Sequence, residues 1–367
     1  MDWFKATYHL ESTPADIEAR AEALAIEQSL EMPPSAVRQP EILRDILARV
    51  ESIEPAEPGY FRVTLEMSVA TTGLQAAGLL NVLFGNCALQ EDVELVDVEF
   101  PPSLLEVFPG PQYGILGLRN LLGVHDRPLT CTALKPQGLG PQGLADLAYT
   151  FASGGLDVVK DDHGITNQAY APFHRRVPAI QRAVERANRE TGGRTLYAPM
   201  LAGSPRVLEE NLRVARGEGI QAVLVAPMLI GLPLFEELVR NLGLVVLAHP
   251  AFAGNRIRPP LFFGKLFRLF GADAVIYPNH GGRFSYSSET CMSLAQAARA
   301  PWAHLRPALP VPAGGMTVER VEEILGFYGL DTMLLIGGNL LAAGEGVLER
   351  TRAFVGRVAA SSVGFAR

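Results

Sequence analysis

Apolar and polar residues follow two different rhythms along the chain. Over the first 100 residues, strand-like segments occupy residues 4–10, 48–53, 60–69 and 93–100. Helical spacing of apolar residues follows Thr13-Pro14 and returns over residues 73–84, which is typical of amphipathic helices. The resulting order, βαββαβ, predicts a ferredoxin-like α+β domain at the N-terminus.

From about residue 128 to 345 the pattern changes to short apolar runs, each followed by small or polar residues and then a helix-like segment. The eight runs are 131–134, 156–159, 195–198, 222–226, 245–248, 274–277, 309–312 and 332–336. Eight such repeats predict an α/β chain with a (β/α)8 TIM barrel rather than an open doubly wound sheet. We expect an N-terminal domain at residues 1–120 and a barrel catalytic domain at 121–367.

Ionisable residues follow several of the predicted strands. Lys135 comes directly after the first run, the cluster Lys160-Asp161-Asp162-His163 after the second, and His249 after the fifth. Barrel enzymes carry their chemistry at the C-terminal ends of the strands. These side chains are therefore expected to converge on one mouth.

The Lys160 cluster allows two interpretations. It could form a structural ion pair at the rim of the barrel. It could instead be a metal or acid–base centre, because a lysine among carboxylates can take up carbon dioxide as a carbamate and so become an oxygen ligand for magnesium. For His249, a polar contact or a proton-transfer role is weighed against a structural one.

Glycine pairs follow the last two strands, as Gly314-Gly315 and Gly337-Gly338. In TIM barrels these two loops often bind phosphate through backbone N–H groups, although glycines are also common in turns. Arg283 follows Gly281-Gly282 in the sixth loop. It could close over an anionic substrate or be an ordinary surface arginine.

Composition limits the kinds of partner and the cellular compartment that we expect. The net charge of -7 and the lack of a basic run argue against nucleic acid as a partner. Three widely spaced cysteines argue against a disulfide framework and for a reducing compartment. The start MDWFKATYHL does not resemble a signal peptide, and the most apolar stretch, 222–235, is short and contains two prolines. We expect a cytoplasmic protein with no membrane partner.

Several motifs together resemble the Rubisco large-chain family. The segment 154–162, GGLDVVKDD, is similar to the motif of the carbamylated lysine, with Lys160 at that position. The segment 131–136, CTALKP, is similar to the strand-one motif that carries a second catalytic lysine. Further similarities lie at 108–115, Gly85-Asn86, Glu27-Gln28-Ser29, His249, 313–315 and Gly337-Gly338.

The resemblance implies a magnesium ion held by Lys160, Asp162 and the residue at position 163, with a carbamate on Lys160. It also implies a homodimer, or an assembly of dimers. In such a dimer, Glu27 and Asn86 of the partner subunit would complete each site.

Departures from the family pattern indicate a non-carboxylating form IV Rubisco-like protein. His163 replaces an acid, Arg283 replaces the lysine of the mobile loop, Gln137 replaces a strand-one lysine, and Pro250 replaces the arginine after the strand-five histidine. The last change implies a substrate with one phosphate. His163 leaves three interpretations open: a weak metal ligand, a general base beside a two-ligand magnesium, or a metal-free site.

The function implied is enolisation of a phosphorylated ketose, with Lys135, Lys160, His163 and His249 as catalytic groups. We favour 5-methylthioribulose 1-phosphate isomerase, in methionine salvage. The alternatives are a decarboxylase of a 3-oxo sugar-acid phosphate, of the 3-oxo-isoapionate 4-phosphate type, and a 2,3-diketo-5-methylthiopentyl-1-phosphate enolase. A degenerate homologue that only binds sugar phosphates is the non-enzymatic alternative.

Overall fold

The computed structural model describes residues 2–282, 284 and 286–362. The chain divides into two compact units. Unit 1 is Met1–Pro109 with Gly254–Phe262, and unit 2 is Gly110–Ala253 with Phe263–Arg367. The boundary expected at residue 120 falls inside helix α5 (Gly114–Leu122). That helix belongs to unit 2 because its leucines pack into the barrel core.

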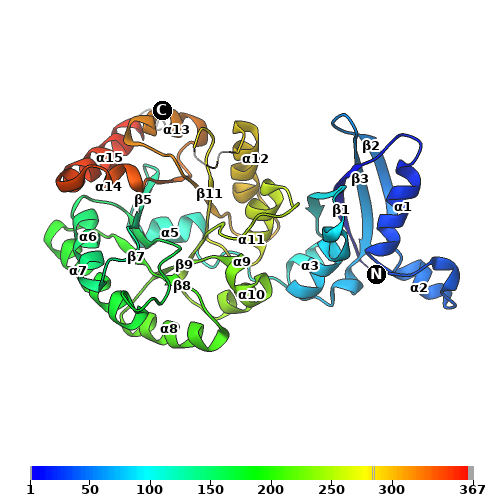
Figure 1. The fold of residues 1–367 in the computed structure, drawn as a ribbon, viewed down its shortest axis with the longest axis horizontal. Coiled ribbons are helices and arrows are strands. Elements are labelled where there is room, and N and C mark those ends of the chain that lie inside the picture. Colours follow the sequence, from blue (N-terminus) through cyan, green and yellow to red (C-terminus); the bar gives the residue numbers. More distant parts are fainter. Residues whose placement is uncertain (1, 283, 285, 363–367) are drawn as a thin grey trace. The chain divides into compact units, whose positions relative to one another are not determined.

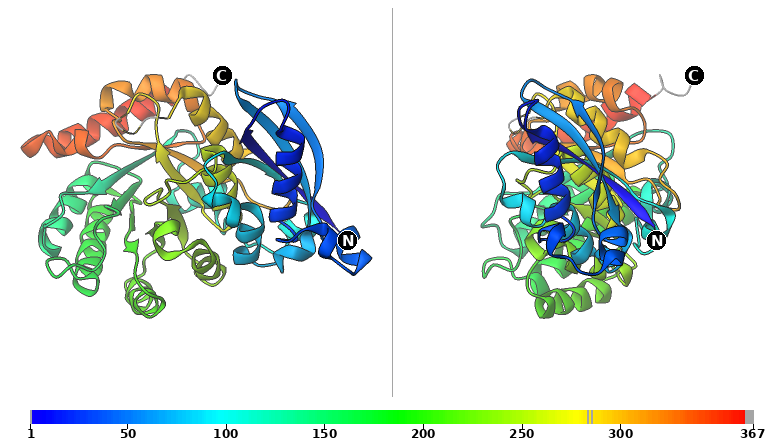
Figure 2. Two further views of the ribbon diagram at one scale, coloured as in Figure 1. Left: turned by 45° about the vertical axis from the view of Figure 1, so that its right-hand side comes forward. Right: turned by 90° about the vertical axis from the view of Figure 1, so that its right-hand side faces the viewer.

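Unit 1 is built on one antiparallel sheet with the strand order β2-β3-β1-β4. This order, with the succession βαββαβ, confirms the ferredoxin-like fold (Figure 2). The main elements are β1 (Trp3–Glu11), α1 (Ile17–Glu27), β2 (Arg49–Pro55), β3 (Tyr60–Ser68), α3 (Ala76–Phe84) and β4 (Val93–Glu99). Short helices are η1 (Pro34–Ala36), α2 (Pro40–Asp45), η2 (Val69–Thr72), η3 (Asn86–Leu89) and α4 (Pro102–Leu105).

The core of unit 1 follows the two periodicities of its sequence. Every second residue of β1 is buried: Phe4, Ala6, Tyr8 and Leu10, as the pleat of a strand requires. The Tyr8 hydroxyl donates a 2.8 Å hydrogen bond to the main-chain oxygen of Leu83 in α3, which ties that helix to the sheet.

The segment Gly254–Phe262 also belongs to unit 1, although about 140 residues of unit 2 precede it in the chain. It runs along β4, where Leu95 N donates to Arg256 O and Arg258 N donates to Leu95 O, both at 2.9 Å. The Arg258 Nε is 2.5 Å from Glu94 Oε2. The segment therefore extends the sheet of unit 1 sideways, beyond its edge strand β4.

Unit 2 is a (β/α)8 barrel, in which a ring of parallel strands lies inside a ring of helices (Figure 1). Its strands are β5 (Leu129–Leu134), β6 (Val158–Asp161), β7 (Leu196–Ala198), β8 (Met200–Leu201), β9 (Ala222–Val225), β10 (Val245–Ala248), β11 (Ala274–Pro278), β12 (Leu309–Ala313) and β13 (Met333–Leu335). Pro199 splits the third barrel strand into β7 and β8. All eight predicted apolar runs therefore supply barrel strands.

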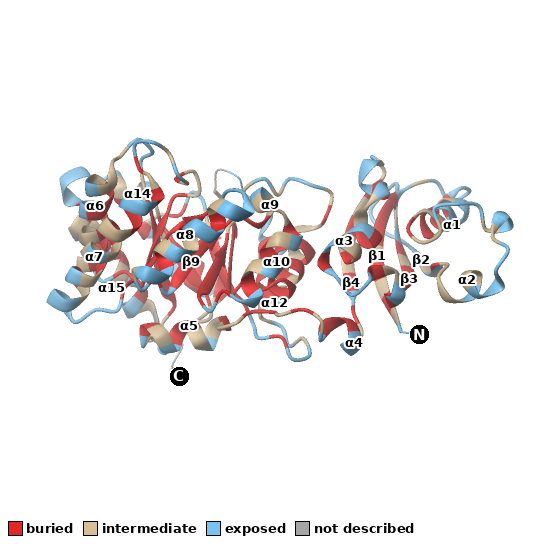
Figure 3. Ribbon diagram, turned by 90° about the horizontal axis from the view of Figure 1, so that it is seen from below, coloured by how far each residue is buried: buried red, intermediate tan, exposed pale blue. Residues whose placement is uncertain are grey.

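Helices follow the strands around the outside of the barrel. They are α6 (Pro141–Ser153), α7 (Phe173–Thr191), α8 (Pro205–Gly217), α9 (Pro227–Ile230), α10 (Leu232–Arg240), η4 (Pro260–Leu266), α11 (Phe267–Leu269), α12 (Ser288–Arg299), η5 (Val318–Arg320), α13 (Val321–Tyr328), α14 (Gly338–Leu341), η6 (Gly344–Gly346) and α15 (Val347–Ser362). Burial is concentrated in the strands and on the inner faces of these helices (Figure 3). None of the helices that the structure describes is both long and apolar enough for a bilayer crossing.

The barrel has one seam without a hydrogen-bond ladder. Among the described residues, regular pairing joins every neighbouring pair of barrel strands except β12 and β13. The N–H of Leu309 in β12 points away from β13, toward β11, and donates to Asp273 O at 2.8 Å. The strand positions whose N–H groups would point toward β13 are Pro310 and Pro312. Because proline has no N–H, β12 cannot donate main-chain hydrogen bonds to β13 there.

One fully buried arginine secures the end of α12. The guanidinium of Arg268 donates to four main-chain oxygens, those of Ala297, Ala300, Leu305 and Arg306, at 2.7 to 3.2 Å. Burial lowers the pKa of Arg268 to about 10. Arg268 thus satisfies two carbonyl groups at the C-terminal end of α12, which the helix leaves unpaired, and two more in the loop that follows.

Candidate active site

A cavity of about 620 Å³ opens at the C-terminal ends of the barrel strands. It is lined by Ala133, Lys135, Lys160, Asp162, His163, His249, Pro250, Ile276, Tyr277, Pro278, Phe284, residues 313–317, Leu335 and residues 337–339. The structure therefore brings together the predicted lysines, acid, histidines and both glycine pairs. We call this cavity the mouth pocket.

Lys160 lies deepest among the charged groups of the mouth pocket. It is 2% exposed, and its Nζ donates to the main-chain oxygen of Asp161 at 3.2 Å. Burial lowers the pKa of Lys160, because an apolar environment disfavours the ammonium form. Only the neutral amine can take a proton or react with carbon dioxide, and burial increases its share.

Asp162 is ion-paired with Lys135, which enters from β5. Its other oxygen, Oδ1, accepts a 3.2 Å hydrogen bond from Gly164 N. Burial alone would raise the pKa of Asp162, but the Lys135 ammonium outweighs it and lowers the pKa. Asp162 is therefore a carboxylate, and Lys135 places a positive charge at the mouth.

His163 and His249 stack face to face, with ring centroids 4.1 Å apart and an interplanar angle of 16°. His163 Nδ1 is 3.7 Å from Asp162 Oδ1. His249 Nδ1 accepts a 3.1 Å hydrogen bond from Ala251 N, so Nε2 carries the proton of the neutral ring. Burial is the main cause that lowers the pKa of both histidines. The pKa of His249 is lowered more than that of His163. Both rings are therefore favoured as neutral imidazoles. The Nδ1 lone pair of His249 is already occupied, so His163 is the ring available as a base and His249 offers its Nε2–H as a donor.

The glycine pairs line the mouth pocket on the loops after β12 and β13. Gly314 and Gly315 have φ of +81° and +72°, a backbone region that favours glycine. A Cβ on Gly282 would lie 2.2 Å from the Gly314 oxygen, so the sixth loop passes directly against the seventh. Arg283, predicted to bind substrate, lies outside the described residues.

Glu27 and Asn86 meet in unit 1. Asn86 Nδ2 donates to Glu27 Oε1 at 2.9 Å. Two residues that are 59 positions apart in the chain thus form one polar pair. They were predicted together as a contribution to the partner subunit's site.

Asp161 is the member of the predicted cluster that does not line the mouth pocket. Successive residues of a strand point to opposite faces, so Asp161 points outward from the barrel, where it pairs with Arg176 of α7. The expectation of two acids at the mouth is wrong for Asp161, which forms a buried ion pair with Arg176 instead. Strand alternation could have shown this from the sequence.

The apolar wall of the mouth pocket was also not predicted. Ile276, Tyr277, Pro278, Met316 and Leu335 line it. Their positions gave no signal because apolar residues at strand ends look like ordinary core. The wall lies mainly on β11 and the loop after β12, across the barrel from Lys160.

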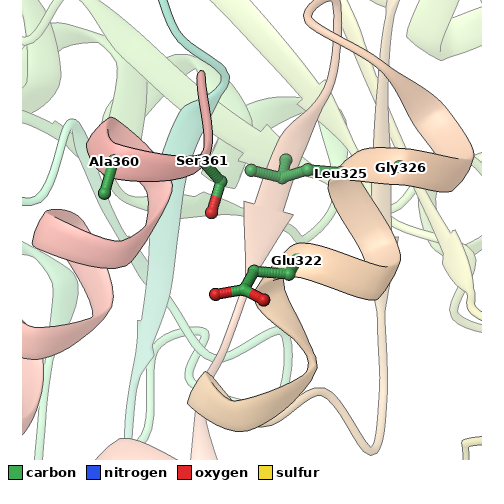
Figure 4. A pocket seen from close by; sticks show the side chains of 5 residues that line it. All are labelled: Glu322, Leu325, Gly326, Ala360 and Ser361. Carbon is green, nitrogen blue, oxygen red and sulfur yellow. The ribbon is translucent and has the colours of Figure 1, made fainter. Parts of the chain in front are cut away.

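A second cavity lies outside the barrel between α13 and α15 (Figure 4). It is lined by Glu322, Leu325, Gly326, Ala360 and Ser361. With Glu322 as the one ionisable group of that lining, this cavity offers no set of groups for acid–base chemistry.

The comparisons with known proteins agree with one another. Residues 114–353 match the family described as "Ribulose bisphosphate carboxylase large chain, catalytic domain". The chain is 51% identical to "Ribulose bisphosphate carboxylase-like protein 1" of Rhodopseudomonas palustris, over 96% of both chains. It is also 51% identical to "5-methylthioribulose-1-phosphate isomerase" of Rhodospirillum rubrum, over 98% of this chain and 97% of that one.

A crystal structure of a Rubisco-like protein from Rhodopseudomonas palustris has the same fold, with a TM-score of 0.92, 47% identity and 98% of each chain covered. The family match spans more than half of the chain, and it includes every residue found at the mouth pocket. The chain belongs to the Rubisco large-chain family, among its Rubisco-like, non-carboxylating members.

Proposed function

We propose that this protein is an isomerase of 5-methylthioribulose 1-phosphate that acts in the salvage of methylthio sugars. The observation that carries the proposal is the mouth pocket itself. Its lining combines two lysines, a carboxylate and two stacked histidines with two glycine loops. A relative that is 51% identical over nearly the whole chain bears the name of this activity.

The reaction moves a carbonyl along the sugar without net oxidation. A base removes the proton from the carbon beside the carbonyl, and the electron pair of that C–H bond forms the C=C of an enediolate. The former carbonyl carbon then takes a proton, and the neighbouring hydroxyl loses one to become the new carbonyl. Such proton transfers need a base of suitable pKa and a stabilised oxyanion.

The residues of the mouth pocket fit these roles. Lys160 and His163 are the candidate bases, because burial favours their neutral forms. His249, with Nδ1 occupied by Ala251 N, would donate its Nε2–H to the substrate. Lys135 is the cation that would stabilise the oxyanion. Lys160 and His163 together suit a reaction that shifts protons at two carbons.

We infer that the substrate carries one phosphate, held by the backbone of Gly314, Gly315, Gly337 and Gly338, with Arg283 closing over it. Glycine lets the backbone approach an anion closely. Pro250 lines the same pocket and has no side-chain donor for a second phosphate.

A magnesium site is part of the proposal. Within the described part of the chain, no three His, Cys, Asp or Glu side chains are arranged to hold a metal ion. Asp162 and His163 therefore need a third ligand, and a carbamate on Lys160 would supply an oxygen. Magnesium prefers oxygen ligands, so Lys160 and Asp162 fit it better than His163 does. A bound ion would polarise the carbonyl of the substrate.

We also propose a homodimer, in which Glu27 and Asn86 of the partner subunit complete the site, and a cytoplasmic location. Their mutual hydrogen bond supports a shared role. The three cysteines are free and buried, which suits a reducing compartment.

Incubation with 5-methylthioribulose 1-phosphate in deuterated water, followed by NMR of the carbon-bound protons, tests the function. Deuterium incorporation together with an isomeric product is the expected result. Carbon dioxide release from a 3-oxo sugar-acid phosphate would support the decarboxylase instead. Deuterium exchange without an isomer would point to an enolase, and no turnover or exchange at all would support the non-enzymatic alternative.

A further inference from the structure

A buried hydrogen-bond network lies directly behind the mouth pocket, centred on Asp161. Its carboxylate is fully buried. Oδ1 accepts a 2.8 Å hydrogen bond from the hydroxyl of Tyr197 in β7. Oδ2 accepts hydrogen bonds from Arg176 Nε at 3.1 Å and from Met200 N at 3.0 Å, and it is ion-paired with Arg176 Nη2 at 3.0 Å. Four elements of the barrel, β6, β7, β8 and α7, therefore meet at this one carboxylate.

The Arg176 side chain, also fully buried, extends the network to the loop after His163. Its Nη1 donates to the main-chain oxygens of Thr166 at 2.9 Å and Ala171 at 2.7 Å. One guanidinium thus holds the strand end before Asp162 and the loop after His163. The segment that carries both side chains is fixed on each side.

The network reaches the pocket through one peptide group. Lys160 Nζ donates to the main-chain oxygen of Asp161, whose side chain the network holds. If the Asp161 peptide turned, that oxygen would move and Lys160 Nζ would lose its hydrogen-bond partner. The position of the amine in the mouth pocket therefore depends on the arrangement around Asp161.

The energetics of a buried ion pair favour a role beyond stability. Desolvation of two charges offsets most of their attraction, and well-packed apolar replacements are often as stable. The Tyr197 ring and the Arg176 stem could fill the same space without their polar groups. What the polar groups add is direction, because each hydrogen bond fixes an angle.

We propose that Arg176 and Tyr197 are positioning residues, which hold Asp161 so that Lys160 Nζ and the Asp162 carboxylate keep their places in the mouth pocket. The kinetic part of this inference rests on the proposed isomerase function. Its spectroscopic part does not.

Tyr197→Phe is the least disruptive variant, since it removes one hydroxyl and keeps the ring. We expect kcat to fall about tenfold while KM changes less than about twofold, because a single directional hydrogen bond is lost. The matched control is Tyr149→Phe, which removes a hydroxyl bound to the Glu190 carboxylate on the outer helices. The control should keep the wild-type kcat.

Arg176→Met alone leaves Asp161 as an unpaired buried charge and could fail to fold. The double variant Asp161→Asn with Arg176→Met removes both charges and keeps similar volumes. We expect it to unfold at a higher urea concentration than Arg176→Met, yet to keep a kcat at least about tenfold below wild type. Recovery of kcat together with stability would show a merely structural role and overturn the proposal.

The spectroscopic test uses the small number of lysines. The chain contains four: Lys5, Lys135, Lys160 and Lys265. Lysine labelled with ¹³C and ¹⁵N then gives four side-chain signals, and Lys160→Ala identifies the one that belongs to Lys160. We expect this signal to shift in Tyr197→Phe at constant pH, and the Lys5 and Lys265 signals to stay in place.

An unshifted Lys160 signal overturns the proposal, whatever the kinetics. A shifted signal with unchanged kcat also overturns it, because the position of Lys160 would then not matter to the reaction. If wild-type protein does not turn over 5-methylthioribulose 1-phosphate, the proposed function fails, and the Lys160 signal alone decides whether the network positions the lysine.

Discussion

The imidazole of His163 lies flat against that of His249, 4.1 Å from centroid to centroid. By the resemblance of the sequence motifs, His163 replaces an acid of the family pattern, whereas His249 matches the strand-five histidine. Two protonated rings would repel each other at this distance, and burial already favours the neutral forms. The replacement thus adds a second neutral imidazole beside one already present.

The first prediction concerns the metal preference that follows from this pair. His163→Glu should raise the affinity for Mg²⁺ at least about tenfold, because a carboxylate oxygen suits magnesium better than an imidazole nitrogen does. Isothermal titration calorimetry in the presence of bicarbonate measures the change. His174→Glu, on the exposed side of α7, is the matched control. Equal affinities in both variants would show that position 163 is not a ligand position.

The second prediction is that turnover depends on a divalent ion. Dialysis against a chelator should abolish activity, and Mg²⁺ added with bicarbonate should restore it, since a carbamate on Lys160 completes the proposed ligand set. Turnover is measured by NMR of the product. Activity that survives chelation, with no metal left by elemental analysis, would establish the metal-free alternative.

The third prediction concerns Lys160. Lys160→Ala should lower kcat by at least about a hundredfold, because it removes both a candidate base and the carbamate position. The fold should persist, since a buried amine with a lowered pKa contributes little to stability. Circular dichroism checks the fold, and Lys5→Ala, in unit 1, is the control. Near-normal turnover by Lys160→Ala would refute a catalytic role.

Much of the fold could be predicted because the sequence repeats a local pattern. The eight apolar runs became barrel strands, and period-two burial in β1 matched its alternation. The contribution of Gly254–Phe262 to unit 1 could not be predicted in this way. That segment contains no periodic apolar positions, and its place in the sheet depends on pairing with a strand about 160 residues earlier.

The candidate site was predictable to a similar extent. Strand ends indicated Lys135, Lys160 and His249, because the barrel topology gathers C-terminal ends. The separation of Asp161 from Asp162 needed only the strand alternation. The links from Asp161 to Arg176 and Tyr197 were not visible, because they join residues whose spacing in the chain carries no pattern.

The fourth prediction concerns the contact between the sixth and seventh loops. Gly282→Ala should raise KM about tenfold, because the new methyl group would lie 2.2 Å from the Gly314 oxygen and push the proposed phosphate loop away. Steady-state kinetics measure the effect. Gly356→Ala, in α15 with open space around it, should leave KM unchanged. An unaltered KM in Gly282→Ala would show that this approach does not shape the phosphate site.

The fifth prediction concerns stability. Arg268→Met should lower the free energy of unfolding by about 3 kcal/mol, because four main-chain oxygens lose their donor. Urea unfolding followed by fluorescence measures the change. Arg206→Met removes an exposed arginine on α8 and is expected to cost less than about 0.5 kcal/mol. A small effect of Arg268→Met would mean that water replaces the lost donors.

Because Gly254–Phe262 belongs to unit 1, unit 1 cannot complete its fold until most of the barrel has been synthesised. The ribosome releases β1 to β4 early, yet the segment that lies along β4 follows only after five of the eight barrel strands. The edge of β4 at Leu95, which pairs with Arg256 and Arg258 in the finished fold, stays open for that interval. Nascent chains stopped before residue 254 should therefore expose this edge to chaperones or to other chains, and chains released beyond residue 262 should not.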